Sequence, residues 1–157
     1  MNVLTEKGLK SLAFEREAVA KFLAIHPRYD FVETPKEQPS AIDGVLVRDG
    51  VTRALVEARC RKMTRDTLRG AFGDTWMVTM AKLEKGRTLS ELLCLPFVGM
   101  LYLLPERVLI VLDVTDDRGK WKFEFERRVT TAQKCINGGL ATRLNAFLPL
   151  ATAKEYT

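Results

Sequence analysis

The sequence predicts an α/β fold in which helices flank a mixed central sheet. Three observations indicate this class. Residues 5–25 carry apolar side chains at helical spacing, residues 41–60 and 97–115 each contain two β-rich apolar runs, and helix-forming segments separate the two pairs. The chain has 157 residues, the length of one ordinary domain, so we expect residues 1–157 to form a single domain.

The first helix is expected over residues 5–25, because Pro27 disfavours helical backbone at the residue before it. Successive residues of a helix are about 100° apart, which brings most apolar positions of this segment onto one face. Arg16 projects near the middle of that face and Glu17 lies at its edge. The apolar residues of the face are Leu9, Leu12, Ala13, Val19, Ala20, Leu23 and Ala24.

Three strands are expected next, over residues 29–34, 41–47 and 51–60. Asp49 and Gly50 separate the second strand from the third, which is a strong hairpin signal. Both hairpin strands carry apolar residues on both faces, as central strands that are covered on each side do. Charged residues within them therefore need an explanation.

Further helices are expected after the hairpin, each with a polar residue that can cap its N-terminus. They cover residues 65–72, residues 75–85 and a short segment before Pro96, with Thr64, Asp74 and Thr88 as the caps.

Two more apolar strands are then expected over residues 97–104 and 107–115. Aromatic and charged residues alternate over residues 121–126, which predicts an edge strand with one face in water. Residues 131–148 are expected to form the last helix.

Composition and charge exclude several classes of protein. Hydrophobic residues make up 46% and charged residues 29% of the chain, which is typical of a folded domain and not of a disordered, collagen-like or coiled-coil chain. The formal net charge is +5, a basic excess that is compatible with a nucleic-acid partner.

The expected location is the cytoplasm, either of a phage host or of the cell that encodes the protein. The three cysteines fit neither a disulfide framework nor a zinc site by their spacing, so we expect reduced thiols. No apolar run of signal-peptide length follows the first residues. The longest apolar stretch, residues 92–104, is shorter than a membrane span and contains a proline, so no membrane association is expected.

The informative motif consists of Asp43 on one expected strand and Glu57 and Arg59 on the next. Carboxylates supply the hard oxygen ligands that Mg²⁺ prefers. Residues two positions apart on a strand share a face, so the cation of Arg59 would lie beside the carboxylate of Glu57. A bound divalent ion would polarise a phosphoryl oxygen and activate water, while the cation would stabilise developing negative charge.

Hairpin register decides whether these three residues meet. A two-residue turn at Asp49 and Gly50 would put Asp43 and Glu57 on opposite faces of the sheet. A three-residue loop with Gly50 in a bulge would put Asp43, Glu57 and Arg59 on one face. The metal-site hypothesis therefore predicts the three-residue loop.

This pattern, with a glutamate-bearing helix in front, resembles the PD-(D/E)XK nuclease superfamily. The matching residues are Glu17, Asp43, Glu57 and Arg59, the last in the place of the usual lysine. The resemblance implies a restriction-endonuclease-like αβββαβ core and hydrolysis of DNA phosphodiester bonds with Mg²⁺ or Mn²⁺. It also implies that Asp43 and Glu57 ligate the metal and that Glu17 is an outer ligand.

Arginine stays protonated at working pH, so Arg59 can stabilise charge but cannot act as a base. The sequence leaves three alternatives open. Arg59 acts electrostatically alone, or Lys62 or Lys82 has taken over the lysine role, or catalysis is lost and the protein is a nucleic-acid-binding or accessory subunit.

A run of basic residues follows Glu57 and is a candidate surface for phosphate contacts. Its residues are Arg61, Lys62, Arg65 and Arg69, and Arg16 on the first helix is a further candidate. Cleavage of two strands or of a junction, as in a phage or mobile-element recombination or repair nuclease, would require a homodimer. The expected edge strand at residues 121–126 is a candidate interface for it.

Overall fold

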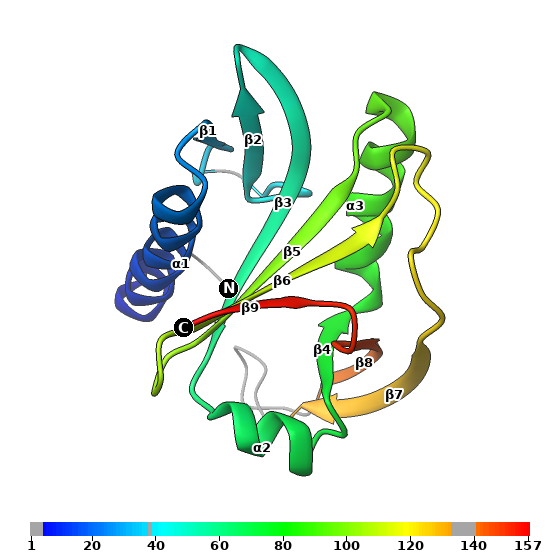
Figure 1. The fold of residues 1–157 in the computed structure, drawn as a ribbon. Helices are drawn as coiled ribbons and strands as arrows, with labels where there is room; N and C mark the ends of the chain where they lie inside the picture. The colour runs from blue at the N-terminus through cyan, green and yellow to red at the C-terminus, as the bar shows by residue number, and fades with distance from the viewer. Residues whose placement is uncertain (1–4, 38, 133–140) are drawn as a thin grey trace.

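The computed structural model describes residues 5–37, 39–132 and 141–157. In the described part, three strands follow the first helix and five strands follow the last one (Figure 1). The elements are α1 (Glu6–Ile25), β1 (Tyr29–Glu33), β2 (Gly44–Arg48), β3 (Val51–Arg61), α2 (Arg65–Gly70), β4 (Thr75–Thr79), α3 (Met80–Leu93), β5 (Phe97–Leu103), β6 (Val108–Thr115), β7 (Glu126–Ala132), β8 (Ala141–Pro149) and β9 (Lys154–Tyr156).

Nine strands of the described part form two sheets. The large sheet has the strand order β1-β2-β3-β5-β6-β9, and the small sheet has the order β4-β8-β7. Strands β3 and β5 are parallel, whereas all other neighbouring strands are antiparallel. The segment between β3 and β5 crosses over through α2, β4 and α3. The predicted α/β class with a mixed central sheet is therefore confirmed.

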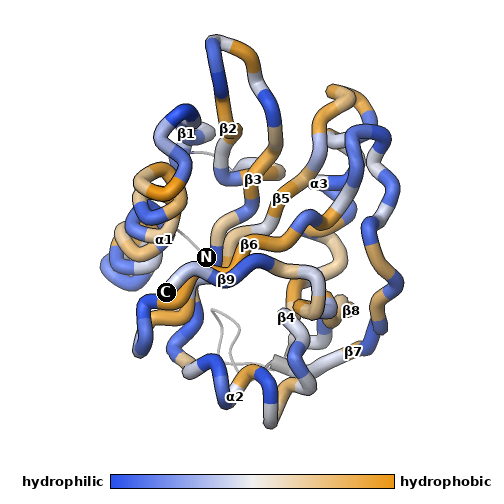
Figure 2. The backbone as a smooth tube through the Cα atoms, in the orientation of Figure 1, coloured by the Kyte–Doolittle hydropathy of each residue, from blue (hydrophilic) through white to orange (hydrophobic). Residues whose placement is uncertain are grey.

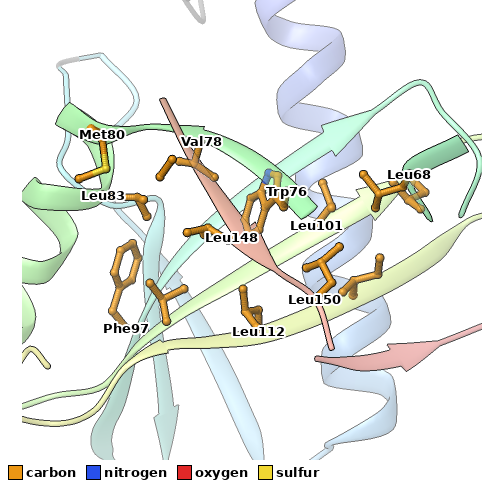
Figure 3. Packing of buried hydrophobic residues seen from close by; sticks show 14 of the residues in the cluster. Leu68, Trp76, Val78, Met80, Leu83, Phe97, Leu101, Leu112, Leu148 and Leu150 are labelled. Atoms are coloured by element: carbon orange, nitrogen blue, oxygen red, sulfur yellow. The ribbon is translucent and has the colours of Figure 1, made fainter. Parts of the chain in front are cut away.

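Two hydrophobic clusters cover the two faces of the large sheet. Helix α1 packs on one face, where Val19 and Phe22 join Val56 and Met100. The small sheet and α3 cover the other face. There, Trp76 and Leu148 point toward the side chains of the large sheet (Figure 3). Hydrophobic residues run along strand β6, whereas α2 at the periphery is mostly hydrophilic (Figure 2).

Helix α1 begins and ends where the sequence predicts. The Thr5 side chain accepts a hydrogen bond from the backbone N–H of Gly8 and caps the N-terminus. The buried face differs from the predicted one, since Leu9 is 53% exposed and Ala13 and Ala20 are also exposed. Its buried residues are Gly8, Leu12, Ala18, Val19 and Phe22.

The hairpin turn has two residues, so the predicted three-residue loop is wrong. Asp49 and Gly50 both have positive φ, 53° and 74°, and Arg48 pairs with Val51. This is the turn that matches the twist of the flanking strands best. Taken alone, it would put Asp43 and Glu57 on opposite faces.

A β-bulge corrects this register. Val47 pairs with Thr52, but the next residue of β2, Leu46, pairs with Ala54. Arg53 is therefore an extra residue on β3. Pairing then continues to Gly44 opposite Val56. The next residues along, Asp43 and Glu57, therefore share a face, as the metal-site hypothesis requires.

The segment between β3 and β5 differs from its prediction. Helix α2 has the predicted cap, since the Thr64 side chain accepts a hydrogen bond from the Thr67 N–H. Residues 75–79, predicted as helix, form strand β4, in which Trp76 and Val78 are buried and Met77 lies on the other side. One continuous helix, α3, replaces the two predicted helices.

Gly86 lies inside α3 because the Phe97 ring occupies the space of a side chain. A Cβ atom on Gly86 would lie 2.2 Å from Phe97 Cε2. We expect Gly86→Ala to lower the free energy of unfolding by about 1–3 kcal/mol, since Phe97 is buried and must move.

Urea unfolding measures this effect, with Gly70→Ala as the matched control. A Cβ atom on Gly70, at the end of α2, meets no atom within 4 Å. Equal unfolding free energies for the two variants would contradict the packing argument.

The predicted C-terminal helix over residues 131–148 is also wrong. Strand β8 pairs with β4 on one side and β7 on the other, and residues 133–140 of the predicted helix lie outside the described residues. The predicted edge strand over residues 121–126 is absent as well. Trp121 makes one isolated bridge to Thr115, and its ring packs against the core. The homodimer therefore stays a prediction, but residues 121–126 do not form the edge strand that was its candidate interface.

Cys60 is partly buried and Cys94 is exposed. None of the helices in the described ranges combines the length and the apolar character needed to cross a bilayer.

Candidate functional site

The site lies at the N-terminal end of β2, where the neighbouring strand β3 continues past its last pair with β2. Strand β2 pairs with β3 only as far as Val56, whereas β3 runs on to Arg61. Asp43 immediately precedes β2, and its Oδ2 atom accepts a hydrogen bond of 2.7 Å from the Ala58 N–H. The Asp43 carboxylate thus partners a backbone group of β3 beyond the last β2 pair.

Glu57 is buried at the centre of this site, with an exposed fraction of 2%. Its Oε1 lies 2.6 Å from Arg59 Nη2, and its Oε2 lies 3.4 Å from Lys82 Nζ. Neither contact is aligned as a hydrogen bond, so both carboxylate oxygens lack a hydrogen-bond partner among the described residues. Burial first, and the Asp43 carboxylate second, raise the pKa of Glu57 to about 8 despite the two cations.

The Arg59 guanidinium contacts three carboxylates. Besides Glu57, its Nη1 lies 3.5 Å from Glu15 Oε1 and 3.9 Å from Asp43 Oδ2. The same nitrogen donates to the backbone oxygen of Ala58 at 3.3 Å. We call Glu15, Asp43 and Glu57 the carboxylate cluster.

Glu15 is the acidic residue of α1 that joins the cluster, and sequence reasoning missed it. It lies three residues after Leu12 and four before Val19, both on the buried face of α1. Burial and the neighbouring Asp43 raise the pKa of Glu15 to about 7. The spacing of Glu15 from Leu12 and Val19 was the sequence signal for its burial. It was not recognised because a different apolar face of α1 was predicted to be buried.

Glu17 lies apart from the cluster. Positions 15 and 17 of a helix are about 200° apart around its axis, so they face different surroundings. The Tyr102 hydroxyl donates to Glu17 Oε1 at 2.8 Å, and Arg107 Nε lies 3.6 Å from the same oxygen. The resemblance implied that Glu17 lies near Asp43 and Glu57, and the structure does not bring them together.

Of the two candidate lysines, Lys82 reaches the cluster. Besides its contact with Glu57, Lys82 donates to the Ser40 backbone oxygen at 2.9 Å. Lys62 follows the last residue of β3 and is exposed. A lysine that the sequence did not single out, Lys36, lies 3.6 Å from Asp43 Oδ1 and donates to the Asp43 backbone oxygen. The three carboxylates are thus accompanied by three cations.

Several arginines of the predicted phosphate-binding surface make structural ion pairs instead. Buried Arg65 contacts Asp74 and Glu155, and thereby ties α2 to β9. Arg69 also contacts Glu155.

Arg16 has a similar structural partner. It makes two hydrogen bonds, of 2.7 and 3.0 Å, to Glu33 of β1. Arg61 differs from these arginines, because it donates a hydrogen bond to a backbone oxygen, that of Cys60.

The donor set of the cluster fits a hard divalent cation in one respect. In the part of the chain that the structure describes, no three His, Cys, Asp or Glu side chains are placed to hold a metal ion together. Mg²⁺, however, is commonly bound by one or two carboxylates together with water and substrate phosphate. Asp43 and the two unaligned oxygens of Glu57 fit that smaller set, provided that Arg59 shifts from Glu57.

No protein-family model, curated protein or solved structure matches the chain. The fold defines the protein as mixed α/β with a mixed central sheet, and the carboxylate cluster is its candidate functional site.

Proposed function

We propose that the protein is a nuclease that hydrolyses phosphodiester bonds of DNA with Mg²⁺ or Mn²⁺. The observation that carries the proposal is the meeting of Asp43 and Glu57 on one face, with the buried Glu57 carboxylate lacking aligned hydrogen bonds. The order α1-β1-β2-β3, followed by helices and the parallel strand β5, supports a restriction-endonuclease-like core.

Asp43 and Glu57 would hold the ion, which when bound supplies a Lewis acid for the phosphoryl oxygen and lowers the pKa of a water molecule. Glu15 lies on the α1 side of the same cluster, and its raised pKa lets it carry a proton near neutral pH. Arg59 would turn from the carboxylates toward the substrate phosphate and stabilise the negative charge that develops there. Lys82 would take the role of the missing lysine.

A cleavage assay tests the proposal. Linear duplex, single-stranded, supercoiled and four-way-junction DNA are incubated with the protein and Mg²⁺ or Mn²⁺. We expect the wild type to cut at least one substrate, and EDTA to stop it. Asp43→Asn should lower the rate at least about a hundredfold, because it removes a negative ligand but preserves the shape.

The matched control is Asp30→Asn, an exposed aspartate of β1, which should cleave like the wild type. Circular dichroism establishes that both variants fold. Wild-type protein that leaves every substrate intact with both metals would disprove the nuclease proposal.

A second candidate function is nucleic-acid binding without catalysis. The observation that favours it is the position of Arg59, whose guanidinium already contacts Glu15, Asp43 and Glu57. In that case, the protein binds nucleic acid, cuts none, and loses no affinity when EDTA is added. Metal-dependent cleavage that Asp43→Asn abolishes would rule this candidate out.

A further inference from the structure

A basic pocket lies beside the carboxylate cluster, between β3 of the large sheet and the small sheet. Its volume is about 410 Å³, within the usual range of ligand pockets. Four cationic side chains line it, and none of its described lining residues is acidic. The cations are Arg59, Arg61, Lys82 and Arg143.

Two of these cations lack the carboxylate partners that the others have. Arg59 and Lys82 contact Glu57, whereas none of the ion pairs among the described residues involves Arg61 or Arg143. Burial first, and the neighbouring guanidinium of Arg59 second, lower the pKa of Arg61. A partly buried arginine beside another cation is stabilised by an anion that enters between them.

The small sheet adds neutral hydrogen-bonding groups to the same pocket. Asn145 of β8 is 5% exposed, and its Nδ2 donates to Thr130 Oγ1 of β7. Both residues line the pocket, as does Thr79 at the start of α3. Hydroxyl and amide groups together with arginines are the usual ligands of phosphate oxygens.

The pocket adjoins the carboxylate cluster, because Arg59 and Lys82 line the pocket and also contact Glu57. A strand whose phosphodiester lay at Asp43 and Glu57 would therefore pass directly into the basic pocket. Arg143 comes from β8, far from β3 in the sequence, so the pocket depends on the two sheets packing together.

We propose that this pocket binds a phosphate group of a nucleic-acid strand next to the phosphodiester at the carboxylate cluster. The inference deepens the proposed nuclease function and rests on it for the direction of the strand. Arg61 of β3 and Arg143 of β8 bind the phosphate from the two sheets, and the nucleic-acid strand runs from the cluster along the small sheet.

Fluorescence anisotropy in EDTA tests the pocket without any cleavage. The probe is a short fluorescein-labelled oligonucleotide, used single-stranded and as a duplex. We expect Arg143→Ala and Arg61→Ala each to weaken binding roughly tenfold. The slope of log affinity against log salt should also fall by about 0.7–0.9, the share of one phosphate contact.

Arg28→Ala is the matched control, because Arg28 is a 73% exposed arginine that pairs with Asp49 at the hairpin turn. It should bind like the wild type. Arg61→Lys, which keeps the charge of a partly buried residue, should retain most of the affinity if the Arg61→Ala loss is not a folding defect.

Unchanged affinity and salt slope in both alanine variants would overturn the pocket proposal, even if the wild type cleaves DNA. Conversely, weakened binding in both variants, together with wild-type protein that cuts nothing, would support the pocket and disprove the nuclease.

Discussion

Replacing Lys82 with alanine is expected to lower the rate of the proposed DNA cleavage about a hundredfold or more. Lys82 Nζ lies 3.4 Å from the buried Glu57 carboxylate, and it is the lysine that α3 brings to the cluster. Arg59 stays protonated at every working pH, so it cannot accept or release a proton. Lysine is the usual residue at this position of the proposed nuclease site, so the reaction should depend on Lys82.

Lys85→Ala is the control, since Lys85 is an exposed lysine on the same helix. Lys82→Arg separates the charge of Lys82 from its proton transfer, and we expect it to stay nearly as slow as Lys82→Ala. Single-turnover cleavage at saturating protein measures all three variants. A Lys82→Ala variant that cleaves at the wild-type rate would contradict this role.

The second large effect concerns the stability of the metal-free protein against pH. Burial raises the pKa of Glu57 from 4.5 to about 8, so the folded protein keeps a proton that the unfolded chain releases near pH 4.5. The free energy of unfolding should therefore fall as the pH rises from about 4.5 to about 8. Each pKa unit corresponds to about 1.4 kcal/mol, so the decline is on the order of 5 kcal/mol.

Urea unfolding in EDTA across this pH range measures the decline. Glu57→Gln, which is neutral at every pH, should remove most of it, and Glu15→Gln should remove a smaller part that ends near pH 7. Glu6→Gln is the control, because Glu6 is exposed at the start of α1. A free energy of unfolding that stays constant or rises from pH 4.5 to 8 would contradict the prediction.

The sequence predicted the first half of the fold well, because local signals there agree with the tertiary structure. Pro27 and the turn at Asp49 and Gly50 mark element ends through backbone conformation. Strand β8 was missed because residues 141–149 contain good helix formers, and pairing with β4 and β7 overrides this propensity. Strand β4 did carry a signal, since Trp76 and Val78 alternate with Met77.

The candidate site was predicted in its strand residues and in Lys82 of α3, but not in its α1 residue. Asp43, Glu57 and Arg59 were recognisable because strand alternation is strict, although the bulge that aligns them has no clear sequence signal. Glu15 was not found because two faces of α1 carry apolar residues. Only the packing of α1 against the large sheet decides which one is buried. The pairing of Arg65 with Asp74 and Glu155 likewise depends on elements distant in the chain.

The bulge at Arg53 also determines which insertions the hairpin can accept. One residue added to each strand beside Asp49 and Gly50 lengthens the ladder by one pair and leaves Asp43 opposite Glu57. A single residue added to one strand moves every later side chain of that strand to the opposite face of the sheet. The hairpin tip is therefore a suitable place for a symmetrical pair of added residues, and an unsuitable place for an odd one.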